Sequence, residues 1–197
     1  QGDKIISVDT GLNIPIGAII HDLKGDYIYP SFIDLYSDYG LKKAEKGEYS
    51  YRPQYESKKA GAYHWNEAIH PEVDASKKFV TDKKSAARYL KNGFGSVLTH
   101  VQDGILRGSG CLVLLSERSE HENIIMQQAA NYLSFKKGVS KQKNPSSLMG
   151  SIALIRQLFL DAEWYSAQKD QTNLSYAAVN NNQELPNIFV ANDELDY

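Results

Sequence analysis

The chain has 197 residues, enough for one domain of ordinary size or two small ones, each with a buried core. Hydrophobic residues make up 42% and charged residues 23%, which is the composition of a folded domain and not of a disordered tail. The 22 basic and 24 acidic residues give a net charge of −2 at pH 7, so no electrostatic term favours nucleic acid or an anionic membrane surface. We therefore expect neither as a partner.

Cysteine usage and hydropathy set further bounds. The single cysteine, Cys111, excludes an internal disulfide and a cysteine-rich metal site. No apolar run reaches the roughly 18 to 20 residues that cross a bilayer, and the polar start at residues 1–4 does not resemble a signal peptide. The compartment stays open between cytoplasmic and bacterial periplasmic or secreted.

The first forty residues contain short β-branched and aromatic runs that are separated by glycine and proline. Such runs are typical of strands joined by tight turns. The expected strands cover residues 4–8, 18–23, 27–29 and 32–36.

Residues 41–78 change character, because they are rich in Lys, Glu, Tyr and Gly and follow neither a helical nor a strand period. We interpret them as a long polar excursion. Its histidines, His64 and His70, are expected on the surface. Its aromatic residues indicate that the excursion is ordered against the rest of the chain; they are Tyr49, Tyr51, Tyr55, Tyr63 and Trp65.

From residue 81 onward the pattern alternates between helix and strand. Thr81 or Asp82 can cap a first helix that ends before Gly93, and a longer helix opens near Ser147 with an apolar stripe at spacings of 3 and 4. Strands alternating with helices predict a mostly parallel sheet. The other expected elements are strands 95–101, 111–115 and 185–191, a glycine-containing turn at 104–110, and helices 121–133 and 173–180.

Residues 27–40 read YIYPSFIDLYSDYG and are the most informative segment. The segment resembles the first barrel strand of the amidohydrolase superfamily, particularly its imidazolonepropionase-like and prolidase-like branch. In that family the pattern carries glycine after the proline and a His-x-His pair, which binds a catalytic divalent metal. Here Ser31 replaces the glycine, and Tyr36 and Asp38 stand at the two histidine positions.

The resemblance extends along most of the chain in the family's order. It includes GDKII at 2–6 and IPIGA at 14–18, then AIHP at 68–71, GFGSV at 93–97, GSG at 108–110 and MGSIALIR at 149–156. It implies an α/β fold: the N-terminal part of a TIM-like (β/α) barrel, incomplete here, preceded by a few strands of a small β-sandwich. The implied domains are a sandwich remnant at 1–26 and the first half of a barrel at 27–197.

The spacing of the first-strand residues bears on a metal site. Side chains alternate along a strand, so Asp34, Tyr36 and Asp38 are expected on one face, at the end of a barrel strand where active sites lie. Asp38 could ligate a hard cation, whereas a phenol with an ordinary pKa of about 10 is a poor ligand. Two interpretations stay open: a polar cluster that fills the mouth of a barrel without chemistry, or a repurposed metal site through Asp38.

Among the histidines, only His100 ends a predicted strand near the expected active-site end of the barrel. We select it, with Asp34, Tyr36 and Asp38, as a candidate residue lining the site; a purely structural histidine is the alternative. No catalytic residue can be assigned from the sequence.

The resemblance also bears on length, because a complete (β/α)₈ barrel needs about 250 residues. We therefore expect the N-terminal fragment of a larger protein, inactive alone, with no metal in the fragment. The family hydrolyses C–N bonds of amides, cyclic amides or dipeptides with Zn, Fe or Mn, so an active parent would take a small-molecule amide or peptide substrate.

Two other readings of the parent remain. It could be a pseudoenzyme, a barrel that serves as a binding or assembly module, or it could carry two barrel domains of which this is the degenerate one. In each case an open barrel edge is expected to promote self-association.

Overall fold

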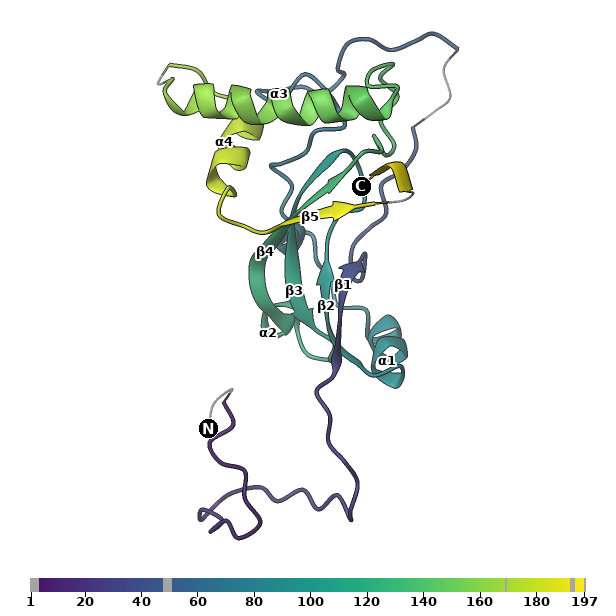
Figure 1. The fold of residues 1–197 in the computed structure, drawn as a ribbon. Helices are drawn as coiled ribbons and strands as arrows, with labels where there is room; N and C mark the ends of the chain where they lie inside the picture. Colours follow the sequence, from purple (N-terminus) through teal and green to yellow (C-terminus); the bar gives the residue numbers. More distant parts are fainter. Residues whose placement is uncertain (1–3, 48–50, 169, 192–193, 197) are drawn as a thin grey trace. The chain divides into compact units, whose positions relative to one another are not determined.

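The computed structural model describes residues 4–47, 51–168, 170–191 and 194–196 (Figure 1). The chain divides into two units, Gln1–Pro30 and Ser31–Tyr197. Among the described residues, none of the helices combines the length and apolarity that crossing a bilayer would require.

The first unit differs from the strands predicted for it. Residues 4–30 contain no strand, and every one of them is exposed. A short strand is stable only when neighbouring strands pair with its backbone and cover its apolar face. Residues 4–30 provide no such pairing for the segments 4–8, 18–23 and 27–29, so the strands predicted there are not present.

The second unit is built on one curled sheet whose strand order follows the chain (Figure 1). Its strands are β1 (Phe32–Ser37), β2 (Phe94–Thr99), β3 (Leu106–Leu114), β4 (Ile124–Ser134) and β5 (Asn187–Val190). The pairs β1–β2 and β4–β5 are parallel, whereas β2–β3 and β3–β4 are antiparallel. The mixed sheet is consistent with part of a barrel, but the expectation of a mostly parallel sheet is wrong.

The antiparallel centre arises where a helix was predicted over 121–133. A short helix, α2 (Glu120–Asn123), begins at the capping box of Ser119 and Glu122, and the chain then continues directly as β4. The β4 segment is rich in Ala, Gln, Met and Leu, which favour helix in isolation. Pairing with β3 on one side and β5 on the other overrides that preference.

The other helices confirm the predicted caps. Helix α1 (Lys83–Lys91) begins where the Asp82 carboxylate accepts backbone N–H groups, and α3 (Leu148–Ser166) begins at Ser147. Asn173 caps α4 (Leu174–Asn181). Two 3₁₀ turns, η1 (Ala75–Lys77) and η2 (Glu194–Asp196), complete the described elements.

The excursion at 41–78 contains no strand and no α-helix in its described part. It is held to the sheet by isolated bridges from Ile69 to Leu106 and from Asp74 to Ser109. Ala68 and Ile69 are fully buried, whereas Tyr51, Tyr55 and Trp65 are exposed. Buried aliphatic residues therefore order this part of the excursion. Of the other aromatic residues, Tyr63 is partly buried, and Tyr49 lies outside the described residues.

Three clusters of buried apolar side chains pack against the sheet. One joins Ile105 of the sheet region to Leu158 of α3, and a second packs Ala86 of α1 against Val97 of β2. The third surrounds Tyr132 of β4.

Replacing Leu158 with Ala should lower the free energy of unfolding by about 2 to 5 kcal/mol, because the change leaves a cavity in the core. Leu158 is 0% exposed, whereas Leu160 on the same helix is 61% exposed. Leu160→Ala is therefore the matched control and should cost far less. Chemical denaturation of the 197-residue chain measures both, and equal losses would contradict the assigned face of α3.

Candidate functional site

Four side chains from consecutive parts of the sheet meet at one place, here called the Arg107 cluster. Tyr36 comes from β1, His100 follows β2, Arg107 lies on β3 and Tyr132 on β4. The His100 and Tyr132 rings are stacked, with centroids 3.5 Å apart and planes 2° apart. The Tyr36 ring lies 5.0 Å from that of His100. The structure thus brings together two predicted site residues, Tyr36 and His100, and adds two others.

The glycines of β3 make this approach feasible. A Cβ at Gly110 would lie 2.6 Å from the Tyr132 ring and 2.9 Å from the Thr99 carbonyl oxygen, so a larger residue would displace the stack. Gly108 has φ +82° and lies against the Val73 carbonyl. The glycines at 108 and 110 are therefore not the predicted turn; they are strand residues at which other chain segments come close.

Arg107 is the charged centre of the cluster and is only 7% exposed. Its Nε donates to the Gly104 carbonyl oxygen at 3.1 Å, and its Nη1 donates to Tyr36 Oη at 3.2 Å. Nη1 also lies 3.4 Å from His100 Nε2. No carboxylate among the described residues pairs with this guanidinium, which stays charged at any ordinary pH.

His100 is held neutral by its surroundings. Burial, together with the nearby Arg107 charge, lowers the pKa of His100 to about 3. A neutral ring can accept from Arg107 at Nε2, which leaves Nδ1 buried and without a partner among the described residues. Burial likewise raises the pKa of Tyr132, whose hydroxyl donates to the Leu35 carbonyl oxygen.

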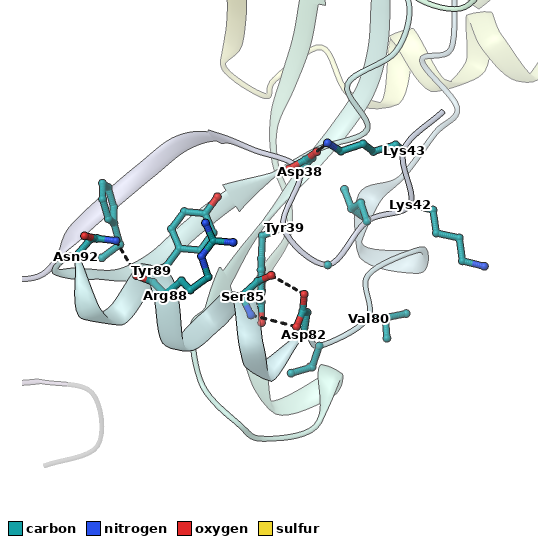
Figure 2. Close-up of a pocket in the computed structure, with 14 residues that line it drawn as sticks. Asp38, Tyr39, Lys42, Lys43, Val80, Asp82, Ser85, Arg88, Tyr89 and Asn92 are labelled. Carbon is teal, nitrogen blue, oxygen red and sulfur yellow. Dashed lines mark hydrogen bonds and ion pairs between the residues drawn. The ribbon is translucent and has the colours of Figure 1, made fainter. Parts of the chain in front are cut away.

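The predicted acidic residues make no ion pair with Arg107 among the described residues, and the Asp34 charge adds to the burial that raises the pKa of Tyr132. The Asp34 carboxylate accepts the Tyr36 backbone N–H at 2.9 Å. Asp38 follows the end of β1, and its carboxylate lies 3.6 Å from Lys43 Nζ. It lines a different cleft of about 800 Å³, beside α1 (Figure 2). A register shift between Asp34 and Ser37 breaks the strict alternation that placed the three residues on one face.

These residues do not fit the divalent metal that the fold family implies. At the first-strand position, the Tyr36 oxygen and His100 Nε2 both face the Arg107 guanidinium, whose charge opposes a second cation. Asp38 is directed to Lys43. The described residues hold no group of three or more His, Cys, Asp or Glu side chains arranged for a metal ion.

The histidines of the excursion also differ from expectation. His64 is buried and accepts the Asn66 backbone N–H at Nδ1, and His70 lies near Asp103; neither is the surface residue that was predicted. Burial lowers the pKa of both histidines. Burial raises the pKa of the Cys111 thiol to about 12, so this cysteine is not a nucleophile.

Sequence reasoning missed Arg107 and Tyr132. Arg107 fell within an assumed turn, and Tyr132 within the assumed helix 121–133. The alternation of glycine with larger residues from 107 to 111 is a signal that β3 begins before the predicted strand at 111–115.

Comparison with known proteins gives one solved structure as the relevant match. No family model matches the chain, and no curated protein matches it. An amidohydrolase from Thermotoga maritima MSB8 superposes with a TM-score of 0.63 at 21% identity, over 92% of this chain and 52% of that protein. The chain has an amidohydrolase-like fold. It spans about half the length of this neighbour.

The pKa of His100 predicts a pH dependence of stability. The folded pKa of about 3 lies below the ordinary value of 6.5, so between these pH values the unfolded state binds a proton that the folded state excludes. Stability should therefore fall as pH falls from 6.5 toward 3. His100→Gln should make the fall shallower, as measured by denaturant unfolding at several pH values.

Exposed His121→Gln serves as the control for loss of a histidine. An NMR titration of the wild-type chain adds a direct reading: the His100 ring resonances should stay constant between pH 5 and 8. A His100 midpoint near 6.5 would contradict the buried, neutral assignment.

Proposed function

We propose that this chain forms one half of an amidohydrolase-like barrel in which a guanidinium takes the place of the first-strand metal, and that this half serves as a binding or assembly module. In this proposal the chain alone does not hydrolyse C–N bonds. It is the N-terminal fragment of a larger protein, related to the imidazolonepropionase-like and prolidase-like branch through the motif at 27–40.

The position of Arg107 carries the proposal. Its Nη1 lies 3.2 Å from Tyr36 Oη, at the residue where the resembled pattern has the first metal-binding histidine. A permanent cation at this distance makes the phenol less available to a divalent ion and costs a bound metal Coulomb energy. The same contact gives the buried arginine a hydrogen-bond acceptor. The presence of tyrosine at position 36, where the resembled pattern has histidine, and the burial of Arg107 therefore depend on each other.

An assembly role is supported by the free edges of the sheet. Strand β1 pairs only with β2 among the described residues, and its exposed side chains include Phe32, Ile33 and Leu35. An open edge with apolar side chains is a surface on which further strands can add. We propose that this edge takes part in self-association or in pairing with the remainder of the barrel.

A metal-dependent hydrolase is the second candidate, and the likeness to the Thermotoga amidohydrolase favours it. In that case Asp38 would supply a carboxylate ligand, and Zn, Mn or Fe would lower the pKa of a bound water and polarise the scissile carbonyl. The substrate would be a small amide, cyclic amide or dipeptide. The two candidates differ in whether Tyr36 and Asp38 hold a metal.

Metal analysis separates the candidates. The protein, purified and then incubated with Zn²⁺ or Mn²⁺ before desalting, should retain no metal that depends on Tyr36 or Asp38. Tyr36→Phe and Asp38→Ala should therefore leave the measured metal content unchanged, and hydrolysis of dipeptides should stay at the buffer rate.

Asp22→Ala, at an exposed position in the first unit, is the matched control for loss of a carboxylate. Stoichiometric metal that disappears in Asp38→Ala but not in Asp22→Ala would reject the proposal in favour of a hydrolase.

A further inference from the structure

A second cleft, of about 580 Å³, opens on the Arg107 cluster and is here called the basic cleft. Its volume is that of a small-molecule site. Apolar walls come from residues such as Val73, Val80 and Val101. The charged side chains that line it are Lys42, Lys43, Lys78, Asp103 and Arg107.

The charge of the basic cleft is mainly positive. Four cationic side chains and one carboxylate, that of Asp103, line it, and one of the four cations, Lys43, is paired with Asp38. This carboxylate is already engaged, since it accepts the Val139 backbone N–H at 2.7 Å and lies 3.7 Å from His70 Nε2. Low-dielectric walls strengthen the field of such a group of like charges and draw anions into the cleft.

Arg107 is a hydrogen-bond donor of the basic cleft that its own contacts hold in place. Its Nε and Nη1 have acceptors in Gly104, Tyr36 and His100, whereas no acceptor for Nη2 is present among the described residues. Arg107 is only 7% exposed as a residue, so its guanidinium is poorly hydrated, and an oxyanion is a partner that supplies both hydrogen bonds and charge balance. The lysines are exposed, so they attract the anion while Arg107 positions it.

We propose that the basic cleft binds a small molecule through a carboxylate or phosphate group, which accepts from Arg107 Nη2 and is flanked by Lys42 and Lys78. The inference rests on the proposed function, because it names the ligand chemistry of a barrel half whose first strand holds a guanidinium. Carboxylate and phosphate share the required chemistry, being oxyanions that match the planar fork of arginine.

The test is an NMR titration of the isotopically labelled chain with inorganic phosphate and, separately, with acetate at constant ionic strength. At least one anion should shift the Arg107 side-chain signal and the Val101 backbone amide saturably. Lys78→Ala should weaken binding about two- to fivefold, as an exposed charge does, and Arg107→Met by at least about tenfold. Exposed Lys91→Ala on α1, outside the basic cleft, is the control and should match wild type.

Several results would overturn the inference. These are shifts that rise linearly without saturation for both anions, an unchanged affinity in Lys78→Ala and Arg107→Met, or an equal loss in Lys91→Ala. If Arg107→Met does not fold, the Lys42→Ala/Lys78→Ala double variant replaces it, and wild-type affinity there is the contradicting result. Much tighter binding of a single-stranded oligonucleotide than of phosphate would also reject a small-molecule site.

The same samples separate this inference from the proposed function. Stoichiometric metal that depends on Asp38 rejects the proposed function. Metal-free protein without saturable anion binding rejects only the anion site. Saturation by phosphate alone or by acetate alone supports the inference and fixes which oxyanion the ligand carries.

Discussion

A guanidinium that is removed from water must find acceptors, because it keeps its charge and cannot be neutralised by losing a proton. Arg107 meets this constraint without a carboxylate among the described residues, using the Gly104 carbonyl, the Tyr36 phenol and the neutral ring of His100. Each of these partners must therefore stay in place and in one protonation state. Burial, together with the Arg107 charge, lowers the pKa of His100 and so keeps the ring in the neutral form that accepts.

Side chains from several strands of the sheet hold these partners of Arg107 in place. His100 is fixed from its other face by Tyr132, whose hydroxyl is tied to the Leu35 carbonyl of β1. The stack can pass over β3 only because residue 110 is glycine. The cluster thus links side chains of β1, β3 and β4 with His100, which follows β2.

The elements that could be predicted from the sequence are those whose signals lie within a few residues of one another along the chain. The predicted caps at Asp82 and Ser147 satisfy the first N–H groups of their helices without help from the rest of the fold, and the strands near 32 and 94 were expected. The antiparallel β3–β4 centre was not predicted, because its pairing overrides the helical preference of residues 124–134. Arg107 and Tyr132 were missed for the same reason, since only that pairing brings them to Tyr36 and His100.

We propose that Arg107, and not a metal ion, occupies and orders the first-strand position. Crystals of the protein soaked in Mn²⁺ and Zn²⁺, with diffraction recorded at the absorption edges, test this directly. We predict that the Arg107 guanidinium is in hydrogen-bond contact with Tyr36 Oη and that no anomalous peak lies near Tyr36, Asp38 or His100. A metal peak ligated by Asp38 together with Tyr36 or His100, with the Arg107 side chain displaced, would contradict it.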